Sequence, residues 1–146
     1  MPLTDLSSFQ QPSLSAGGGT SLGAGLKLLA ECIDREVAKS TPEIKGDWKP
    51  LVFIMTDGGP TDQWQSGLAE FQKRKVGITV ACAAGSAADT NVLKQITEVV
   101  VQLDTADSAT IKAFFKWVSA SISTGSQKVE SDFKEVAGLN ELPPPP

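Results

Sequence analysis

Apolar residues recur along the chain with two periods, one typical of amphipathic helices and one typical of buried strands. Helical spacing begins after a candidate N-cap at Thr20 or Ser21 and ends near Ser40, because Pro42 cannot continue a helix. Further helices are predicted from Thr61 or Asp62, over 90–96, and from 107 or 108 onwards. The side chains expected to face inward from these helices are Leu22, Leu26, Leu29, Ile33, Val37, Trp64, Leu68, Phe71, Ile111, Phe114, Phe115, Val118 and Ile122.

Three apolar runs between these helices predict strands. The run Leu51–Met55 lacks any polar alternation, which is typical of a parallel strand covered on both faces. Similar runs predict strands over 78–83 and 99–103, and a short edge strand is the most that Gln10–Ala16 can form around Pro12. Helices that alternate with strands predict the α/β class, here a three-layer α/β/α, Rossmann-like arrangement with a mostly parallel sheet.

The length of 146 residues is that of one domain, which we place at 1–124. A hydrophobic content of 40% is enough to form a core. From residue 125 the chain is mostly polar and closes in Pro143–Pro146, so 125–146 is expected to be a largely disordered, proline-rich tail. The four prolines are either a ligand for an aromatic groove or part of a linker.

The net charge of the chain and its content of histidine and cysteine exclude several classes of function. With 13 basic and 17 acidic residues the net charge is −4, which argues against a nucleic-acid partner. No apolar stretch approaches the roughly 18 residues of a membrane span, and the N-terminus lacks signal-peptide features, so we expect a cytoplasmic protein without a membrane partner. Without histidine, neither a Ser-His or Cys-His pair nor a His-ligated metal is available. Cys32 and Cys82 are expected to be buried thiols.

The glycine-rich segment Gly17–Gly25 matches the nucleophile-elbow pattern through Gly19-Thr20-Ser21-Leu22-Gly23, but it lacks a preceding strand and a histidine partner. It also lacks both phosphate-binding glycine patterns. Asp57 is more informative, because it follows a predicted parallel strand at the edge where ligands bind in such folds. Asp57 is either a turn residue or an oxygen ligand for Mg²⁺, with Thr20 as a hydroxyl from a neighbouring loop. Thr56, Thr61 and Asp62 are lesser candidates, expected mainly to cap the next helix.

Two motifs carry a resemblance to a known family. Residues 18–26 read Gly-Gly-Thr-Ser-Leu-Gly-Ala-Gly-Leu at the head of an amphipathic helix, and residues 51–58 read Leu-Val-Phe-Ile-Met-Thr-Asp-Gly. Stretches at 33–37, 45–50, 80–85 and 114–121 add to them. From Pro2 to Ile122 the chain therefore resembles a von Willebrand factor A (vWA) domain, of the bacterial tellurium-resistance, TerY-like type.

The resemblance implies a metal-ion-dependent adhesion site (MIDAS). Thr20 matches the threonine of its second loop and Asp57 the aspartate of its third. The first loop, Asp-x-Ser-x-Ser, has no counterpart, and the near match at Asp5–Phe9 has phenylalanine in place of the second serine. Mg²⁺ or another divalent cation is expected in an intact family domain and is expected to bind weakly or not at all here. By the same resemblance, an acidic group of a protein partner completes the metal shell, in a tellurite or chemical-stress response.

The resemblance also implies that the N-terminal strands of the family sheet are missing, which makes Leu51–Met55 an edge. An apolar edge strand invites pairing with another chain, so a homodimer through this edge, or by exchange of the N-terminal segment, is expected. A partner that carries the missing half is the alternative. The leading hypothesis is a non-enzymatic protein-interaction module. The alternatives are a small metal-assisted hydrolase or phosphatase-like enzyme using Asp57, and a purely structural fragment.

Overall fold

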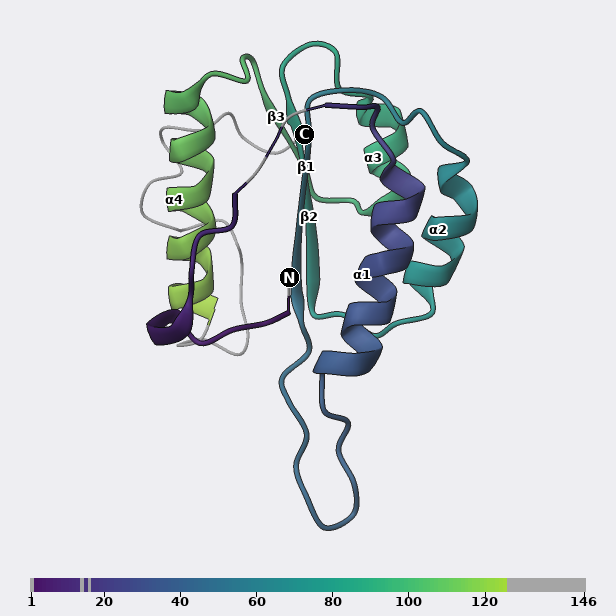
Figure 1. Cartoon of the computed structure of the whole chain (residues 1–146), viewed down its shortest axis with the longest axis vertical. Helices are drawn as coiled ribbons and strands as arrows, with labels where there is room; N and C mark the ends of the chain where they lie inside the picture. The colour runs from purple at the N-terminus through teal and green to yellow at the C-terminus, as the bar shows by residue number, and fades with distance from the viewer. Residues whose placement is uncertain (1, 14, 16, 126–146) are drawn as a thin grey trace. The chain divides into compact units, whose positions relative to one another are not determined.

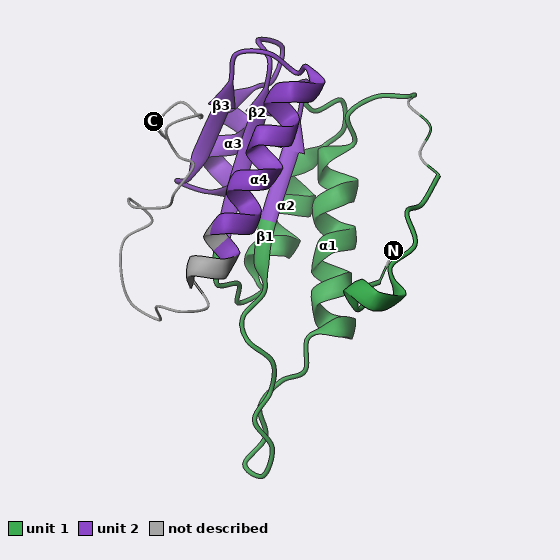
Figure 2. Ribbon diagram, turned by 90° about the vertical axis from the view of Figure 1, so that its left-hand side faces the viewer, with its two compact units in different colours: residues 1–52, 60–78 green, residues 53–59, 79–146 purple. Residues whose placement is uncertain are grey.

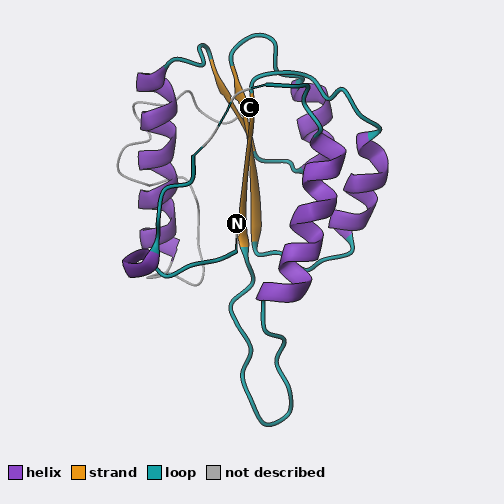
Figure 3. Cartoon of the chain, in the orientation of Figure 1, coloured by secondary structure: helices purple, strands orange, loops and turns teal. Residues whose placement is uncertain are grey.

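A computed structural model describes residues 2–13, 15 and 17–125 and shows an α/β protein (Figure 1). The described residues form a short 3-10 helix, four α-helices and a three-stranded sheet (Figure 3). In chain order the elements are η1 (Leu6–Ser8), α1 (Leu22–Glu36), β1 (Leu51–Thr56), α2 (Trp64–Gln72), β2 (Ile78–Ala84), α3 (Thr90–Ile96), β3 (Val100–Leu103) and α4 (Ser108–Gly125). None of the helices in this part of the chain has both the length and the apolar character needed to cross a membrane.

The chain divides into two compact units (Figure 2). Unit 1 comprises residues 1–52 and 60–78, and contains η1, α1 and α2. Unit 2 comprises residues 53–59 and 79–146, and contains α3, β3, α4 and most of β1 and β2. Each unit is described below by itself.

The sheet has the strand order β1-β2-β3, with β2 and β3 parallel. Ala81 lies opposite Val100, and Ala84 lies opposite Leu103. Parallel neighbours need a crossover connection, which α3 provides between β2 and β3. In unit 2 the strands lie between α3 and α4 (Figure 1). The central strand β2 is completely buried from Val80 to Ala83, so the core of unit 2 is built around it.

β1 is an edge strand of the described sheet, and its side chains are less buried than those of the central strand β2. Its sequence is as apolar as that of β2, but only Val52 is buried. Leu51 is 44% exposed, and the residues from Phe53 to Thr56 are half-buried. The run of apolar residues alone predicts a strand that is buried on both faces. β1 is less buried than this, because it has a neighbouring strand on one side only.

The buried face of α4 differs from the one predicted. Phe114 and Val118 are buried as expected, together with Trp117, but Phe115 is 54% exposed and Ile122 is 41% exposed. Phe114 contacts both of its aromatic neighbours, with ring centroids 5.8 Å from Phe115 and 5.7 Å from Trp117. Successive helical residues are rotated by about 100°, so Phe115 and Ile122, seven residues apart, share a face beside the buried one.

In α1, only Leu26 of the five side chains predicted to face inward is buried, and the other four are half-buried. α1 ends at Glu36 rather than near Ser40. The carboxylate of Asp47 accepts a hydrogen bond from the Ala38 backbone N–H at 2.8 Å, and the Asp47 N–H donates to the Ala38 carbonyl at 2.9 Å. These bonds divert the backbone from the helix before Pro42 is reached.

Three further expectations differ from the structure or fall outside it. α2 begins at Trp64 with Gln63 as N-cap, not at Thr61 or Asp62. The edge strand expected over 10–16 is not formed at the described residues 10–13 and 15. Residues 14 and 16 and the proline-rich tail from 126 lie outside the described residues.

The two thiols are both free, but only one is buried. Cys82 lies on β2, and burial raises its pKa to about 11, so its thiol is protonated and unreactive at neutral pH. Cys32 on α1 is half-exposed, and Arg35 Nη2 lies 3.3 Å from its sulfur. The prediction of a buried thiol is therefore confirmed for Cys82 and wrong for Cys32.

Neighbouring phenylalanines on α4 provide a test of this packing. Phe114→Ala is expected to lower the free energy of unfolding by about 3–5 kcal/mol, because it removes a buried ring and leaves a cavity. Phe115→Ala is the matched control and is expected to cost about 1 kcal/mol or less, because most of its ring faces solvent. Urea denaturation followed by circular dichroism measures both values, and equal losses would show that α4 is rotated from the orientation described.

Candidate functional site

The first part of the candidate site is the N-terminus of α1 in unit 1. The N-cap Ser21 makes no side-chain capping bond. Instead, the carboxylate of Asp62 accepts hydrogen bonds from the backbone N–H groups of Gly23 and Ala24, both at 3.0 Å. Beside it, the Thr61 N–H donates to the Thr20 carbonyl at 2.8 Å. The loop before α2 is thus attached to the first turn of α1.

Asp62 therefore has a structural partner. The two N–H donors from Gly23 and Ala24 hold the pKa of its carboxyl below its usual value, and the positive end of the helix dipole favours the same ionised form. The expectation that Asp62 caps the following helix is wrong, because it caps α1, which precedes it by almost forty residues. With both oxygens engaged, Asp62 is poorly placed to add a metal ligand.

Glycines allow this close approach of the two helices in unit 1. A Cβ atom at Gly67 would lie 2.0 Å from the carbonyl oxygen of Gly23, and one at Gly23 would lie 2.6 Å from the Cα of Trp64. A Cβ at Gly19 would lie 2.5 Å from the Thr61 hydroxyl oxygen. Within the glycine-rich segment Gly17–Gly25, Gly19 and Gly23 therefore serve close packing, whereas a Cβ at any of the other three glycines would meet nothing within 4 Å.

Thr20 lies just before α1 and is half-buried. Its carbonyl oxygen accepts hydrogen bonds from Leu22 and Thr61. Its hydroxyl makes no hydrogen bond with the part of the chain that the structure describes, so it is chemically available as a hydroxyl ligand. The structure thus shows a backbone role for Thr20 and leaves its predicted metal role open to test.

Asp57 belongs to unit 2 and directly follows β1, where its side chain is exposed. The turn behind it is closed by Thr56, whose hydroxyl donates to the Gly58 carbonyl at 3.0 Å. Nearby in this unit, Asp89 accepts from Asn91 and Val92 at the start of α3. The Asp57 carboxylate makes no hydrogen bond or ion pair within the described ranges, so it remains available to a ligand or partner.

Thr20 and Asp57, the two predicted metal ligands, are assigned to different units. Within residues 2–13, 15 and 17–125 no group of three or more Asp, Glu, Cys or His side chains is gathered as a metal site. A firm Mg²⁺ site usually needs one or two carboxylates together with further oxygen ligands. Each unit supplies only one of the two predicted ligands.

A surface cavity of about 380 Å³ lies between α1 and α2 in unit 1. Its acidic side chains, Asp62 and Glu70, are both engaged, the latter with Lys73 at 2.7 Å and with Arg74. The hydrogen bonds from Lys73 and Arg74 lower the pKa of Glu70 below its usual value. A general acid or base working near neutral pH needs a raised carboxyl pKa, so these carboxylates are unsuited to that role. The cavity is lined by Gly23, Ala24, Lys27, Asp62, Gln63, Ser66, Gly67 and Glu70.

Comparison with protein-family models, with curated proteins and with solved structures finds no match to this chain. The likeness to a vWA domain therefore rests on the motifs at 18–26 and 51–58 and stays a prediction. The metal role of Thr20 and Asp57 stays a prediction on the same ground.

The cap formed by Asp62 predicts a pH-dependent stability. Because its pKa is lowered from the usual 3.8, the stabilisation is fully present above that value and is lost as the pH falls through the lower pKa of the folded state. Asp62→Ala is expected to lower the urea midpoint at pH 7, and the difference from the unmodified chain is expected to shrink below about pH 3.8. Asp104→Ala, which removes an exposed carboxylate outside the candidate site, is the control and should leave the midpoint unchanged. An unchanged midpoint for Asp62→Ala at pH 7 would contradict the capping role.

The metal expectation has a direct calorimetric test. Titration of the chain with Mg²⁺ or Mn²⁺ is expected to show no tight site, since the two predicted oxygen ligands are fewer than such ions require. A sub-micromolar site that is abolished by Asp57→Ala and by Thr20→Ala would overturn this expectation and place a metal centre at these residues. Asp104→Ala, another exposed carboxylate, is the matched control.

Proposed function

We propose that the chain is a non-enzymatic protein-interaction module whose partner is a second copy of the chain. Its interface is the edge of β1 that has no neighbouring strand among the described residues. The observation that carries the proposal is the half-burial of an apolar strand at the sheet edge. The vWA-like, three-layer reading of the fold and a role in tellurite or chemical stress belong to the same proposal. They rest on the resemblance at 18–26 and 51–58.

The sequence of β1 contains nothing that blocks pairing. Natural edge strands are commonly protected by charged residues, proline or a bulge, and Leu51–Thr56 contains no charge and no proline. Charged residues occur only just outside it, with Lys49 before the strand and Asp57 after it. Both are exposed. The strand is therefore open to a further strand, and the flanking charges influence how that strand lies.

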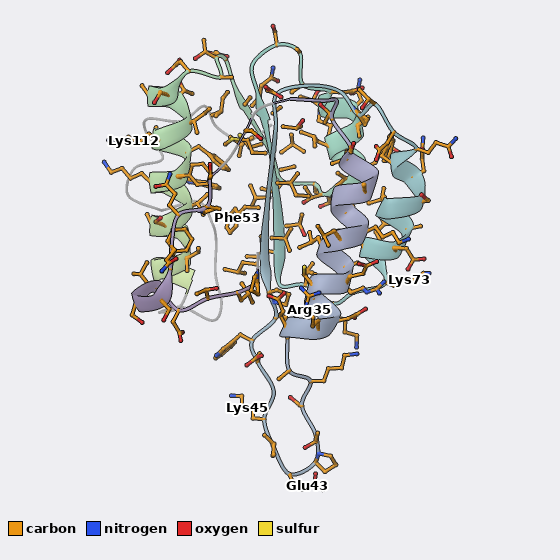
Figure 4. All side chains as sticks on the ribbon, in the orientation of Figure 1. Arg35, Glu43, Lys45, Phe53, Lys73 and Lys112 are labelled. Carbon is orange, nitrogen blue, oxygen red and sulfur yellow. The ribbon has the colours of Figure 1, made fainter. Side chains whose placement is uncertain are left out.

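An antiparallel pair of β1 strands from two copies brings these charges together. Lys49 and Asp57 are each four residues from Phe53. A two-fold axis at Phe53 therefore places Lys49 of each copy opposite Asp57 of the other, with the two Phe53 residues facing each other at the centre. Phe53 is half-buried and points to the α4 side of its strand (Figure 4). Cross-strand aromatic pairs and opposite charges both stabilise antiparallel strands.

A parallel in-register pair of the same strands is unfavourable. It places Lys49 opposite Lys49 and Asp57 opposite Asp57, and like charges directly opposite are destabilising. The charge pattern thus selects one orientation and one register of the pair. In this arrangement the Asp57 carboxylate of each copy pairs with the Lys49 ammonium group of the other copy. The vWA resemblance assigns the same residue to a metal that meets a partner's acidic group, so both readings make Asp57 a partner-binding residue.

Charge reversal tests the proposed register. Lys49→Asp alone and Asp57→Lys alone each create two like-charge contacts in the dimer, and each is expected to raise the dimer Kd about tenfold. The double variant restores two opposite-charge pairs with reversed sign and is expected to return Kd close to that of the unmodified chain. Sedimentation equilibrium at low ionic strength measures these values.

The controls are the same charge changes at exposed residues outside the strand. Lys112→Asp and Asp104→Lys are expected to leave the dimer Kd unchanged. A folded chain that remains monomeric at high micromolar concentration would refute the proposal. A dimer in which the double variant is no better than either single variant would refute this register.

A further inference from the structure

The segment that joins α1 to β1 is a long loop held in a defined shape. It spans residues 37–50 and extends away from the helices of unit 1 (Figure 2). Besides the two bonds between Ala38 and Asp47, the Gly46 N–H donates to the Ser40 hydroxyl at 3.0 Å, and the Thr41 N–H donates to the Ile44 carbonyl at 2.8 Å. A Cβ at Gly46 would lie 2.4 Å from the Ala38 carbonyl oxygen, so glycine is required at this close approach.

This ordered loop leaves its largest side chains in solvent. Trp48 is 76% exposed and Ile44 is 69% exposed. The ammonium group of Lys45 lies 5.3 Å from the centre of the Trp48 ring. The other two tryptophans, Trp64 and Trp117, are buried. Long ordered loops commonly bind ligands, and tryptophan is the residue type most enriched at the centres of protein interfaces.

The chemistry around Trp48 indicates the kind of ligand. An exposed indole is a typical surface for proline rings, whose rigid segments bind with a small loss of conformational entropy. Lys45 adds a positive charge at the ring, so an acidic residue next to the prolines is favoured. The chain contains such a segment, because Glu141-Leu142 immediately precedes Pro143–Pro146.

The charges of the two segments are complementary. The loop carries three lysines and two acidic residues, and one of the latter, Asp47, is bound to the Ala38 N–H. The segment 126–146 carries four acidic residues and two lysines. The loop therefore has a net charge of 3 − 2 = +1 and the segment a net charge of 2 − 4 = −2, so in a chain of net charge −4 the two carry opposite charge.

We propose that the loop is a docking site for the segment Glu141–Pro146 of a second copy of the chain. Trp48 contacts the prolines, and Lys45 pairs with Glu141. This contact does not depend on the β1 edge.

The binding test uses the full chain with Pro143–Pro146 replaced by alanines, so that its own segment does not compete. A fluorescently labelled peptide of residues 138–146 is titrated with this protein, and its anisotropy gives Kd. Trp48→Ala is expected to raise Kd at least tenfold, Trp48→Phe to raise it less, and Lys45→Gln to raise it about threefold and to weaken the salt dependence. Leu28→Ala, an exposed apolar residue on α1, is the matched control and should leave Kd unchanged.

A second readout uses the unmodified chain. Because Trp64 and Trp117 are buried, acrylamide quenching reports mainly on Trp48, and its quenching is expected to fall as the protein concentration rises. The fall should be absent in the alanine-tail variant and should persist in Asp57→Lys, which disturbs only the β1 edge.

Three results would overturn the proposal. The first is absence of peptide binding up to about 1 mM. The second is binding that is equally strong with Trp48→Ala or with an alanine-substituted peptide. The third is Trp48-dependent binding to vesicles of anionic phospholipid without binding of the peptide, which would assign the loop to a membrane surface.

Discussion

The apolar sequence of β1 favours a strand in the interior of a sheet, yet in the sheet described β1 has a neighbouring strand on one side only. Its apolar side chains and its pairing with β2 fix it in the sheet, where β2 is buried from Val80 to Ala83. The other edge of the strand presents backbone donors and acceptors that water or another strand must satisfy. The cost of leaving apolar area in water, about 25 cal/mol for each Å², favours another strand. The functional proposal follows from this constraint.

The elements of the fold could be predicted because their signals are local. The apolar runs at 51–55 and 78–83 and the helical spacing at 22–36 and 90–96 each lie within one segment, and the structure confirms them. The errors occur where a distant group decides the outcome. α1 ends early because Asp47 binds Ala38, a contact that no periodicity reports. The exposure of Phe115 depends on how α4 is rotated, which adjacent apolar residues at 114 and 115 leave ambiguous.

The candidate site was predictable to a smaller extent for the same reason. Thr20 and Asp57 are candidates because of the motifs that contain them, and the structure places both next to the ends of regular elements, while their metal role stays a prediction. The role of Asp62 was missed, because its partners Gly23 and Ala24 are almost forty residues away. One signal was present in the sequence. Glycine in the middle of a helix is destabilising, so Gly67 in α2 indicates a position where another backbone packs closely. The structure places the Gly23 carbonyl at that position.

The loop that carries Trp48 continues directly into β1, and this continuity joins the two proposed contacts. Pro50 accepts a hydrogen bond from the Gly77 N–H at 2.9 Å, which fixes the point where the loop becomes a strand. In an antiparallel pair of β1 strands, the loop of each copy lies next to the turn at Asp57 of the other. In the proposed assembly the adjacent residues Trp48 and Lys49 make different contacts. Lys49 pairs with the β1 strand of the other copy, and Trp48 binds the proline-rich segment. When one contact has formed, the second becomes intramolecular and gains effective concentration. Two weak contacts, each able to form alone, can in this way give a more stable assembly than either contact gives by itself.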